Sequence, residues 1–140
     1  MSILSSTNSG SSNWINSIEK WCEEHNIHHY KLVPTIGNIP FMINVNRDVI
    51  LCGYEDPKLP DFIVFNEIIG GNFIASYSRL TSMKGFPKKV GKNFDISFSN
   101  ISSLEYAPKL INKDFVACGL PFNEQQIREK SEVTNNVYCK

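Results

Sequence analysis

The chain has 140 residues, of which 41% are hydrophobic and 20% charged, and its fourteen basic and fourteen acidic side chains give a formal net charge of zero. This length predicts a single domain with one hydrophobic core, and the composition excludes wholesale disorder. A net charge of zero also excludes a strong overall attraction for nucleic acid or an anionic membrane, so any such binding would have to be local.

The first dozen residues, MSILSSTNSGSS, are mostly Ser, Thr, Asn and Gly after a short apolar start. They lack the basic and apolar regions of a signal peptide, and no apolar run approaches the roughly 18 residues of a membrane span. We therefore expect a disordered tail over residues 1–12 and a soluble protein of the cytoplasm. Free thiols are expected in that reducing compartment, since no C-x-x-C pair joins Cys22, Cys52, Cys118 and Cys139.

An amphipathic helix is predicted between Ser12 and Asn26 by one apolar stripe with i, i+4, i+7 and i+8 spacing. The stripe consists of Trp14, Ile18, Trp21 and Cys22. Ser12 or Asn13 is expected to cap the first turn. Residues 30–33 and 41–52 read as strands on either side of the turn-rich phrase P-T-I-G-N-I-P, so the N-terminal cap should be a helix followed by a hairpin.

A 21-residue repeat occupies the middle of the chain. From Ile69 the sequence reads I-G-G-N-F-I-A-S-Y-S-R-L-T-S-M-K-G-F-P, and from Val90 it reads V-G-K-N-F-D-I-S-F-S-N-I-S-S-L-E-Y-A-P. A truncated copy starts at Ile111 as I-N-K-D-F-V-A-C-G-L-P, and a weaker one starts at Val45 as V-N-R-D-V-I-L-C. Such self-similarity is typical of solenoids, in which each copy forms one coil and buries its apolar edge against the next.

Each copy is predicted to contain one short parallel strand and one tight return. Phe73 with Ala75, and Phe94 with Ile96, show the alternation of a strand with one buried face. The next apolar residues are three apart and are followed by a proline, which favours a tight helical or 3₁₀-like return. These return positions are Leu80, Met83 and Pro87 in one copy and Ile101, Leu104 and Pro108 in the next. Stacked copies should form one buried column of Val49, Phe73, Phe94 and Phe115.

The C-terminal residues predict a second cap. Asn123 with Gln126 is typical of a helix N-cap and its return partner, which predicts a short helix towards Lys130. Val137 and Tyr138 are expected to form a last edge strand.

The order F-x-A-x-x-S-x-L-x-x-M from Phe73, repeated as F-x-I-x-x-S-x-I-x-x-L from Phe94, resembles the leucine-rich-repeat order L-x-L-x-x-N-x-L-x-x-L. The phrases V-G-K-N-F-D-I-S-F-S-N-I-S-S-L and L-T-S-M-K-G-F-P-K-K-V-G resemble the short repeats of small proteins encoded by T4-like bacteriophages. The flanking N-V-N-R-D-V-I-L and F-N-E-Q-Q-I-R-E resemble the caps of those proteins, so the likeness runs from about Trp14 to Val137. The chain departs from the Asn of the repeat order at Ser78, Ser99 and Leu120.

The expected fold class is therefore α+β: a short parallel β solenoid of leucine-rich-repeat type, with an N-terminal helix and hairpin cap and a C-terminal helical cap. A single repeat domain should cover residues 13–140. Its expected parts are the N-terminal cap (13–44), the repeats (45–121) and the C-terminal cap (122–140).

No catalytic, metal or cofactor site is predicted from the residues that carry chemistry. The nearby His25, His28 and His29 lack a carboxylate or cysteine that would complete a ligand set. Cys118 has no activating histidine with an orienting carboxylate at a suitable spacing. The phrase G-G-N-F lacks the following Lys-Ser/Thr of a phosphate loop.

A binding surface is predicted on the outward face of the strands. Tyr77 and Phe98 occupy equivalent positions just beyond two strands, so their rings should lie about 5 Å apart and form an exposed pair. The partner-binding residues expected from outward alternation and this pair are Asn72, Ile74, Ser76, Tyr77, Asn93, Asp95, Ser97, Phe98, Asp114 and Val116. The alternative is that the two rings fold over the turn and shield the edge of the coil.

An alternative surface is a basic patch formed by Arg79, Lys84, Lys88, Lys89 and Lys92, a stretch with no acidic residue. We expect a non-enzymatic module that binds a host protein, as the phage resemblance implies, and acts as an inhibitor or adaptor in host takeover or anti-defence in the host cytoplasm. The first alternative is a nucleic-acid-binding regulator that uses the basic patch, and the second is an enzyme or a ligand-binding domain. A solvated flank that keeps the solenoid in solution would also account for these charges.

Overall fold

The N-terminal helix, α2 (Ser9–Glu24), packs its apolar stripe onto the end of the fold. The computed structural model describes residues 9–140, with side chains from residue 13 onward. Ile18, Trp21 and Cys22 are buried, as the stripe predicted. The helix already includes Ser12 and Asn13, so the expected cap at either residue is wrong, because a helix nucleated by its packed part extends at little cost through polar residues. Residues 9–12 of the expected disordered tail are likewise helical, and the rest of that tail lies outside the described residues. Within residues 9–140, no helix is both long enough and apolar enough to cross a membrane.

The predicted hairpin follows the helix. β1 (Tyr30–Pro34) and β2 (Phe41–Val45) pair antiparallel, which confirms a helix and hairpin at this end. The single strand expected over residues 41–52 is wrong. The strand that starts at Phe41 ends at Val45, and after a turn the chain enters β3 (Val49–Ile50), which belongs to a different sheet.

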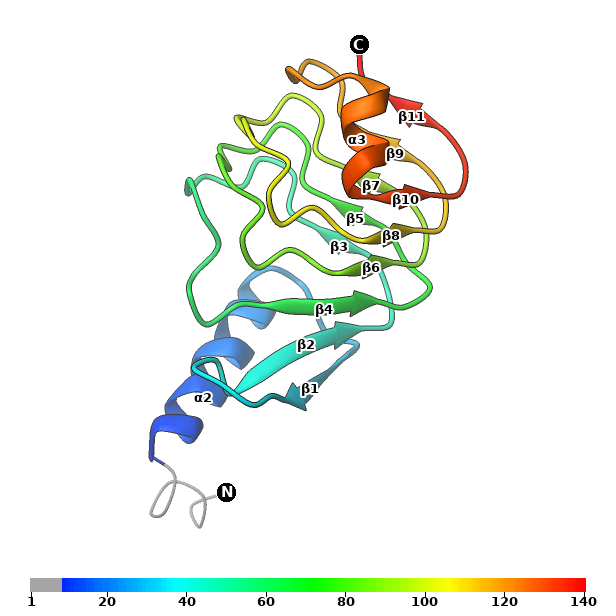
Figure 1. The fold of residues 1–140 in the computed structure, drawn as a ribbon. Coiled ribbons are helices and arrows are strands. Elements are labelled where there is room, and N and C mark those ends of the chain that lie inside the picture. The colour runs from blue at the N-terminus through cyan, green and yellow to red at the C-terminus, as the bar shows by residue number, and fades with distance from the viewer. Residues whose placement is uncertain (1–8) are drawn as a thin grey trace.

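The body of the protein is a short parallel β solenoid of about four turns (Figure 1). Each coil contributes one strand to each of two sheets. The first sheet continues from the hairpin through β4 (Phe65–Ile68), β6 (Lys89–Val90), β8 (Leu110–Ile111) and β10 (Glu132–Val133). The second sheet contains β3, β5 (Phe73–Ile74), β7 (Phe94–Asp95), β9 (Phe115–Val116) and β11 (Val137–Tyr138). Only the second sheet was predicted from the repeat.

The strand register corrects the predicted alignment of the first two full copies. Ile68, and not Ile69, pairs with Val90 in the first sheet, whereas Phe73 pairs with Phe94 in the second. The turn between β4 and β5 therefore holds one residue more than the next turn, and Ile69 lies exposed in it. Gly71 belongs to the same turn, where a side chain is excluded because a Cβ atom would lie 2.5 Å from the backbone carbon of Arg47.

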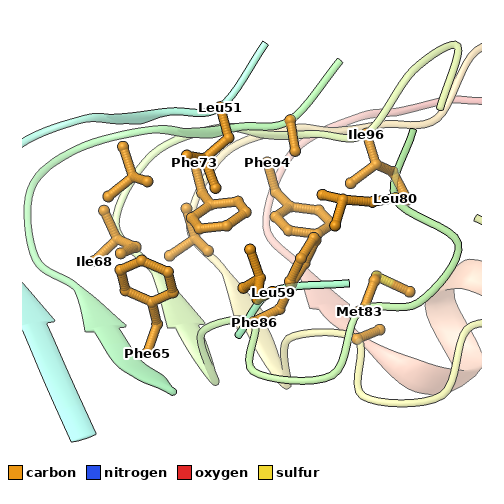
Figure 2. Packing of buried hydrophobic residues seen from close by; sticks show 14 of the residues in the cluster. Leu51, Leu59, Phe65, Ile68, Phe73, Leu80, Met83, Phe86, Phe94 and Ile96 are labelled. Carbon is orange, nitrogen blue, oxygen red and sulfur yellow. The ribbon is translucent and has the colours of Figure 1, made fainter. Parts of the chain in front are cut away.

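The predicted buried column is confirmed, and we call it the inner column. Phe73, Phe94 and Phe115 are fully buried and in register, and Val49 and Val137 continue the column at its two ends. The ring centroids of Phe73 and Phe94 are 5.8 Å apart, and those of Phe94 and Phe115 are 4.9 Å apart. Figure 2 shows Phe73 and Phe94 side by side in the interior.

The return segments bury the expected apolar residues in a different conformation. Leu80, Met83 and Ile101 are buried, but the segments are irregular, so the predicted helical or 3₁₀-like return is wrong. Their backbone groups bond to the neighbouring coil: Asn100 N–H donates to the carbonyl of Leu80, and Arg79 N–H donates to that of Tyr54. These bonds between coils satisfy polar groups that a 3₁₀ turn would have bonded locally.

The C-terminal cap combines a helix with a further coil. In α3 (Glu124–Lys130), the Asn123 side chain accepts from the N–H of Gln126, and the Gln126 side chain accepts from the N–H of Asn123, which confirms the predicted cap. The predicted edge strand at Val137–Tyr138 is also confirmed as β11. Its coil contains a further copy of the repeat that was not predicted, in which V-T-N-N-V from Val133 corresponds to V-G-K-N-F from Val90.

Candidate binding surface

A ladder of Asn and Asp side chains runs along the turn that precedes the second sheet. Asn72 N–H donates to Asp48 Oδ1 at 2.7 Å, and Asn93 N–H donates to Asn72 Oδ1 at 2.8 Å. Asp114 N–H then donates to Asn93 Oδ1, and Asn136 N–H donates to Asp114 Oδ1, both at 3.0 Å. Asn72, Asn93 and Asp114 were predicted to contact a partner, but these bonds give them a structural role in joining successive coils.

Two other predicted contact residues are buried. Ser76 and Ser97 are only 8% and 4% exposed, so their assignment to the outward face is wrong. The strand alternation ends before them because the chain turns a corner there. Ser97 Oγ accepts from Cys118 N–H at 2.9 Å, and Ser76 Oγ lies 3.3 Å from Cys52 Sγ.

The outward residues of the second sheet form one row across five coils, which we call the outer row. By strand register it consists of Ile50, Ile74, Asp95, Val116 and Tyr138. Ile50 and Tyr138 are about half exposed, and the three middle residues are partly exposed. Asp95 is the only charged member, and its Oδ1 accepts from the N–H of Ser97 at 2.9 Å. The row is thus a mostly apolar strip with one carboxylate in the middle.

Beside the outer row, four residues occupy equivalent positions where the chain leaves the second sheet. We call Gly53, Tyr77, Phe98 and Gly119 the corner column. Each of the first three donates its N–H to the next coil, to the carbonyls of Ser76, Ser97 and Cys118 respectively. All four have a left-handed backbone, with φ angles of 72°, 55°, 57° and 77°. The bend at this corner therefore requires a conformation that favours glycine.

The two aromatic members of the corner column form the exposed pair that we predicted. The ring centroids of Tyr77 and Phe98 are 5.0 Å apart and the ring planes are 22° from parallel. Tyr77 is 68% exposed and Phe98 is 51% exposed. A Cβ atom on Gly119 would lie 2.7 Å from the Phe98 ring, so that ring covers the glycine. Phe98 therefore shields the next coil in part, while most of Tyr77 remains in solvent.

The five residues of the predicted basic patch lie on different elements. Lys84 and Lys88 line a cavity beside the hairpin. Lys89 lies in β6 between Glu67 and Leu110 of the neighbouring strands. Lys92 follows that strand in the turn to the second sheet, and Arg79 lies beyond the corner column on a return segment.

Two of the three histidines considered as metal ligands lie beside side chains of α2. His25 packs against Trp21 with centroids 4.2 Å apart, and His28 lies 3.8 Å from Glu23. Within residues 9–140, no three His, Cys, Asp or Glu side chains form a group that could hold a metal ion. Burial, with a contribution from Glu19, raises the pKa of the Cys22 thiol to about 12, so this thiol is poorly suited to act as a nucleophile.

No protein-family model, curated protein or solved structure matches the chain, so proposals about its function start from the surfaces described above.

Proposed function

We propose that the protein is a non-enzymatic binding module that holds a protein partner through Tyr77, Phe98 and the adjacent outer row. The observation that carries the proposal is the exposed, stacked aromatic pair on a left-handed backbone. Aromatic residues near the centre of an apolar surface are the commonest anchors of protein interfaces.

The corner column argues against a purely structural role for these rings. The first and fourth of its coils have glycine at this position, which adopts positive φ without strain. Tyr77 and Phe98 adopt the same backbone at a cost of about 1 to 3 kcal/mol each. Glycine would make the same turn, and both rings are at least half exposed. The cost is therefore better explained by contact with a partner molecule than by packing within the chain.

The neighbouring residues fit a protein interface of ordinary composition. Ile74 and Val116 supply partly exposed apolar surface beside the aromatic pair, and Asp95 lies between them in the strand register. The backbone of this surface is held by bonds between coils, so little ordering entropy would be lost on binding. A rigid apolar strip with one carboxylate favours a partner that offers an apolar groove and a basic or amide group.

The host-directed part of the proposal rests on the resemblance to proteins of T4-like phages. A small phage protein with a binding surface and no proposed catalytic site would act by binding a host protein, as an inhibitor or an adaptor in the host cytoplasm. The nucleic-acid alternative has less support, because the five residues of the predicted basic patch come from several elements and only two of them, Lys84 and Lys88, line the cavity beside the hairpin.

Affinity capture from a bacterial host lysate tests the proposal. The parent protein is immobilised beside Tyr77→Gly/Phe98→Gly and, as a matched control, Lys89→Gln/Lys92→Gln. Enrichment of the captured proteins should fall at least about 30-fold in the aromatic variant, since the loss of even one hot spot of about 2 kcal/mol has an effect of that size. The lysine variant should retain these proteins. Nuclease treatment should change nothing. Retention by the aromatic variant would refute the site, and loss after nuclease or a steep salt dependence would favour the nucleic-acid alternative.

A further inference from the structure

A hollow lies where two return segments pass the hairpin, away from the corner column. This cavity has a volume of about 440 Å³ and shares no residue with the corner column or the outer row. Its apolar lining includes Met42 of β2, Phe86 and Pro87 of one return segment, and Leu104 of the next. We call it the lysine groove, because four lysines also line it: Lys84, Lys88, Lys109 and Lys130.

The four lysines form a local positive charge in a chain whose net charge is zero. Among residues 13–140, none of them lies within 4.0 Å of a carboxylate, and Glu105 is the only acidic residue in the described lining. Lys88 and Lys109 are on adjacent coils, joined by a backbone bond of 2.8 Å from Lys109 N–H to the Lys88 carbonyl. The Lys88 ammonium lies 3.8 Å from Met42 Sδ, at the apolar lining. Lysines gathered without carboxylate partners beside apolar surface favour an anion.

Tyr106 gives the groove an aromatic wall. It lines the cavity, is 53% exposed and has a left-handed backbone with φ of 67°. The matching position one coil earlier is Gly85, with φ of 87°, where a Cβ atom would lie 2.6 Å from the carbonyl oxygen of Ile63. As in the corner column, a strained aromatic residue thus stands where the equivalent coil has glycine.

We infer that the lysine groove binds a small aromatic anion, a flat ring system that carries one carboxylate, phosphate or sulfonate group. The volume falls in the range of small-molecule sites, which are mostly apolar with a few charged groups that orient the ligand. The ligand rings would lie against Tyr106 and the apolar lining, and its anionic group would meet Lys88 and Lys109. This site goes beyond the proposed function and does not depend on it.

Two fluorescent probes with the same ring skeleton test the inference. 8-Anilinonaphthalene-1-sulfonate carries the anionic group, and N-phenyl-1-naphthylamine lacks it. We expect the sulfonate to bind the parent with one-to-one stoichiometry and more tightly than the neutral probe. Lys88→Gln/Lys109→Gln should weaken sulfonate binding by about tenfold and leave the neutral probe unchanged, because charge-assisted hydrogen bonds are lost. Tyr106→Gly should weaken both probes, and the control Lys89→Gln/Lys92→Gln should weaken neither.

Amide chemical shifts of the parent, titrated with the sulfonate, locate the site directly. Changes centred on residues 84–88 and 104–109 would support the groove, and changes centred elsewhere would overturn it. Equal affinity of the two probes, or unchanged sulfonate affinity in the variant lacking Lys88 and Lys109, would also overturn it. If a variant fails to fold, the parent at rising ionic strength provides the same contrast, since only the sulfonate should lose affinity.

Discussion

The inner column and the corner column run along the same coils but differ in the side chains that they contain. Inside, every full coil places phenylalanine at the same register, because Phe73, Phe94 and Phe115 must fill the space between two sheets at close packing. At the corner, two coils have glycine and two have aromatic residues on the same left-handed backbone. The three central coils thus have one kind of side chain in the interior, whereas the corner has two kinds on the same backbone. A side chain that the fold does not require is the better candidate for function.

The largest effect should come from breaking the inner column at its centre. Phe94→Ala removes a fully buried ring that contacts Phe73 and Phe115, and should cost about 3 to 5 kcal/mol of unfolding free energy, enough to unfold a marginal domain. Urea unfolding followed by circular dichroism measures this loss. A variant that unfolds at nearly the parent's urea concentration would show that the column does not carry the stability assigned to it.

A smaller effect is expected from the Asn and Asp ladder, which joins the coils near the inner column. Asn93→Ala leaves the N–H of Asp114 without its acceptor and should cost about 1 to 2 kcal/mol in the same urea experiment. Asn93→Asp is the matched control, because it keeps a side-chain oxygen at a position where the next coil already has Asp114. Equal stability of all three proteins would mean that solvent replaces the bond, and would return Asn93 to the list of possible partner contacts.

The same contrast between inside and outside should appear in thiol chemistry, with almost no effect on stability. Cys22 is fully buried and its pKa is raised to about 12, first by burial, so at pH 8 it is almost entirely protonated. Cys52 is exposed. We expect iodoacetamide to label Cys52 in the folded protein and to label Cys22 only after denaturation, as peptide mapping by mass spectrometry would show. Rapid labelling of Cys22 in buffer would indicate that α2 separates readily from the fold.

Sequence reasoning predicted the features that depend on periodicity. The spacing of Phe73 and Phe94 was sufficient for the inner column and for the stack of Tyr77 on Phe98, since residues at equal positions in a solenoid are neighbours in space. The capping box at Asn123 was predictable because its two partners are three residues apart.

The features that the sequence did not predict are strands too short to show alternation and contacts between residues far apart in the chain. Strands of two residues, such as β6 and β8, show no alternation, so the first sheet was not recognised. Ser97 was placed outward because alternation was continued through a corner that the sequence does not mark. The lysine groove joins Met42, Leu104 and Lys130, whose proximity follows only from the stacking of the coils.

The central claim is that the corner aromatics serve binding and not folding, and the unfolding free energy of Tyr77→Gly/Phe98→Gly tests it most directly. Glycine relieves the strain of positive φ, by about 1 to 3 kcal/mol per residue, and this gain offsets the lost ring stacking and the greater freedom of the unfolded chain. The predicted result is a free energy of unfolding within about 1 kcal/mol of the parent, because the losses and the gain are of similar size. A loss of about 3 kcal/mol or more, comparable to that of Phe94→Ala, would contradict the claim and make the two rings part of the structural stack.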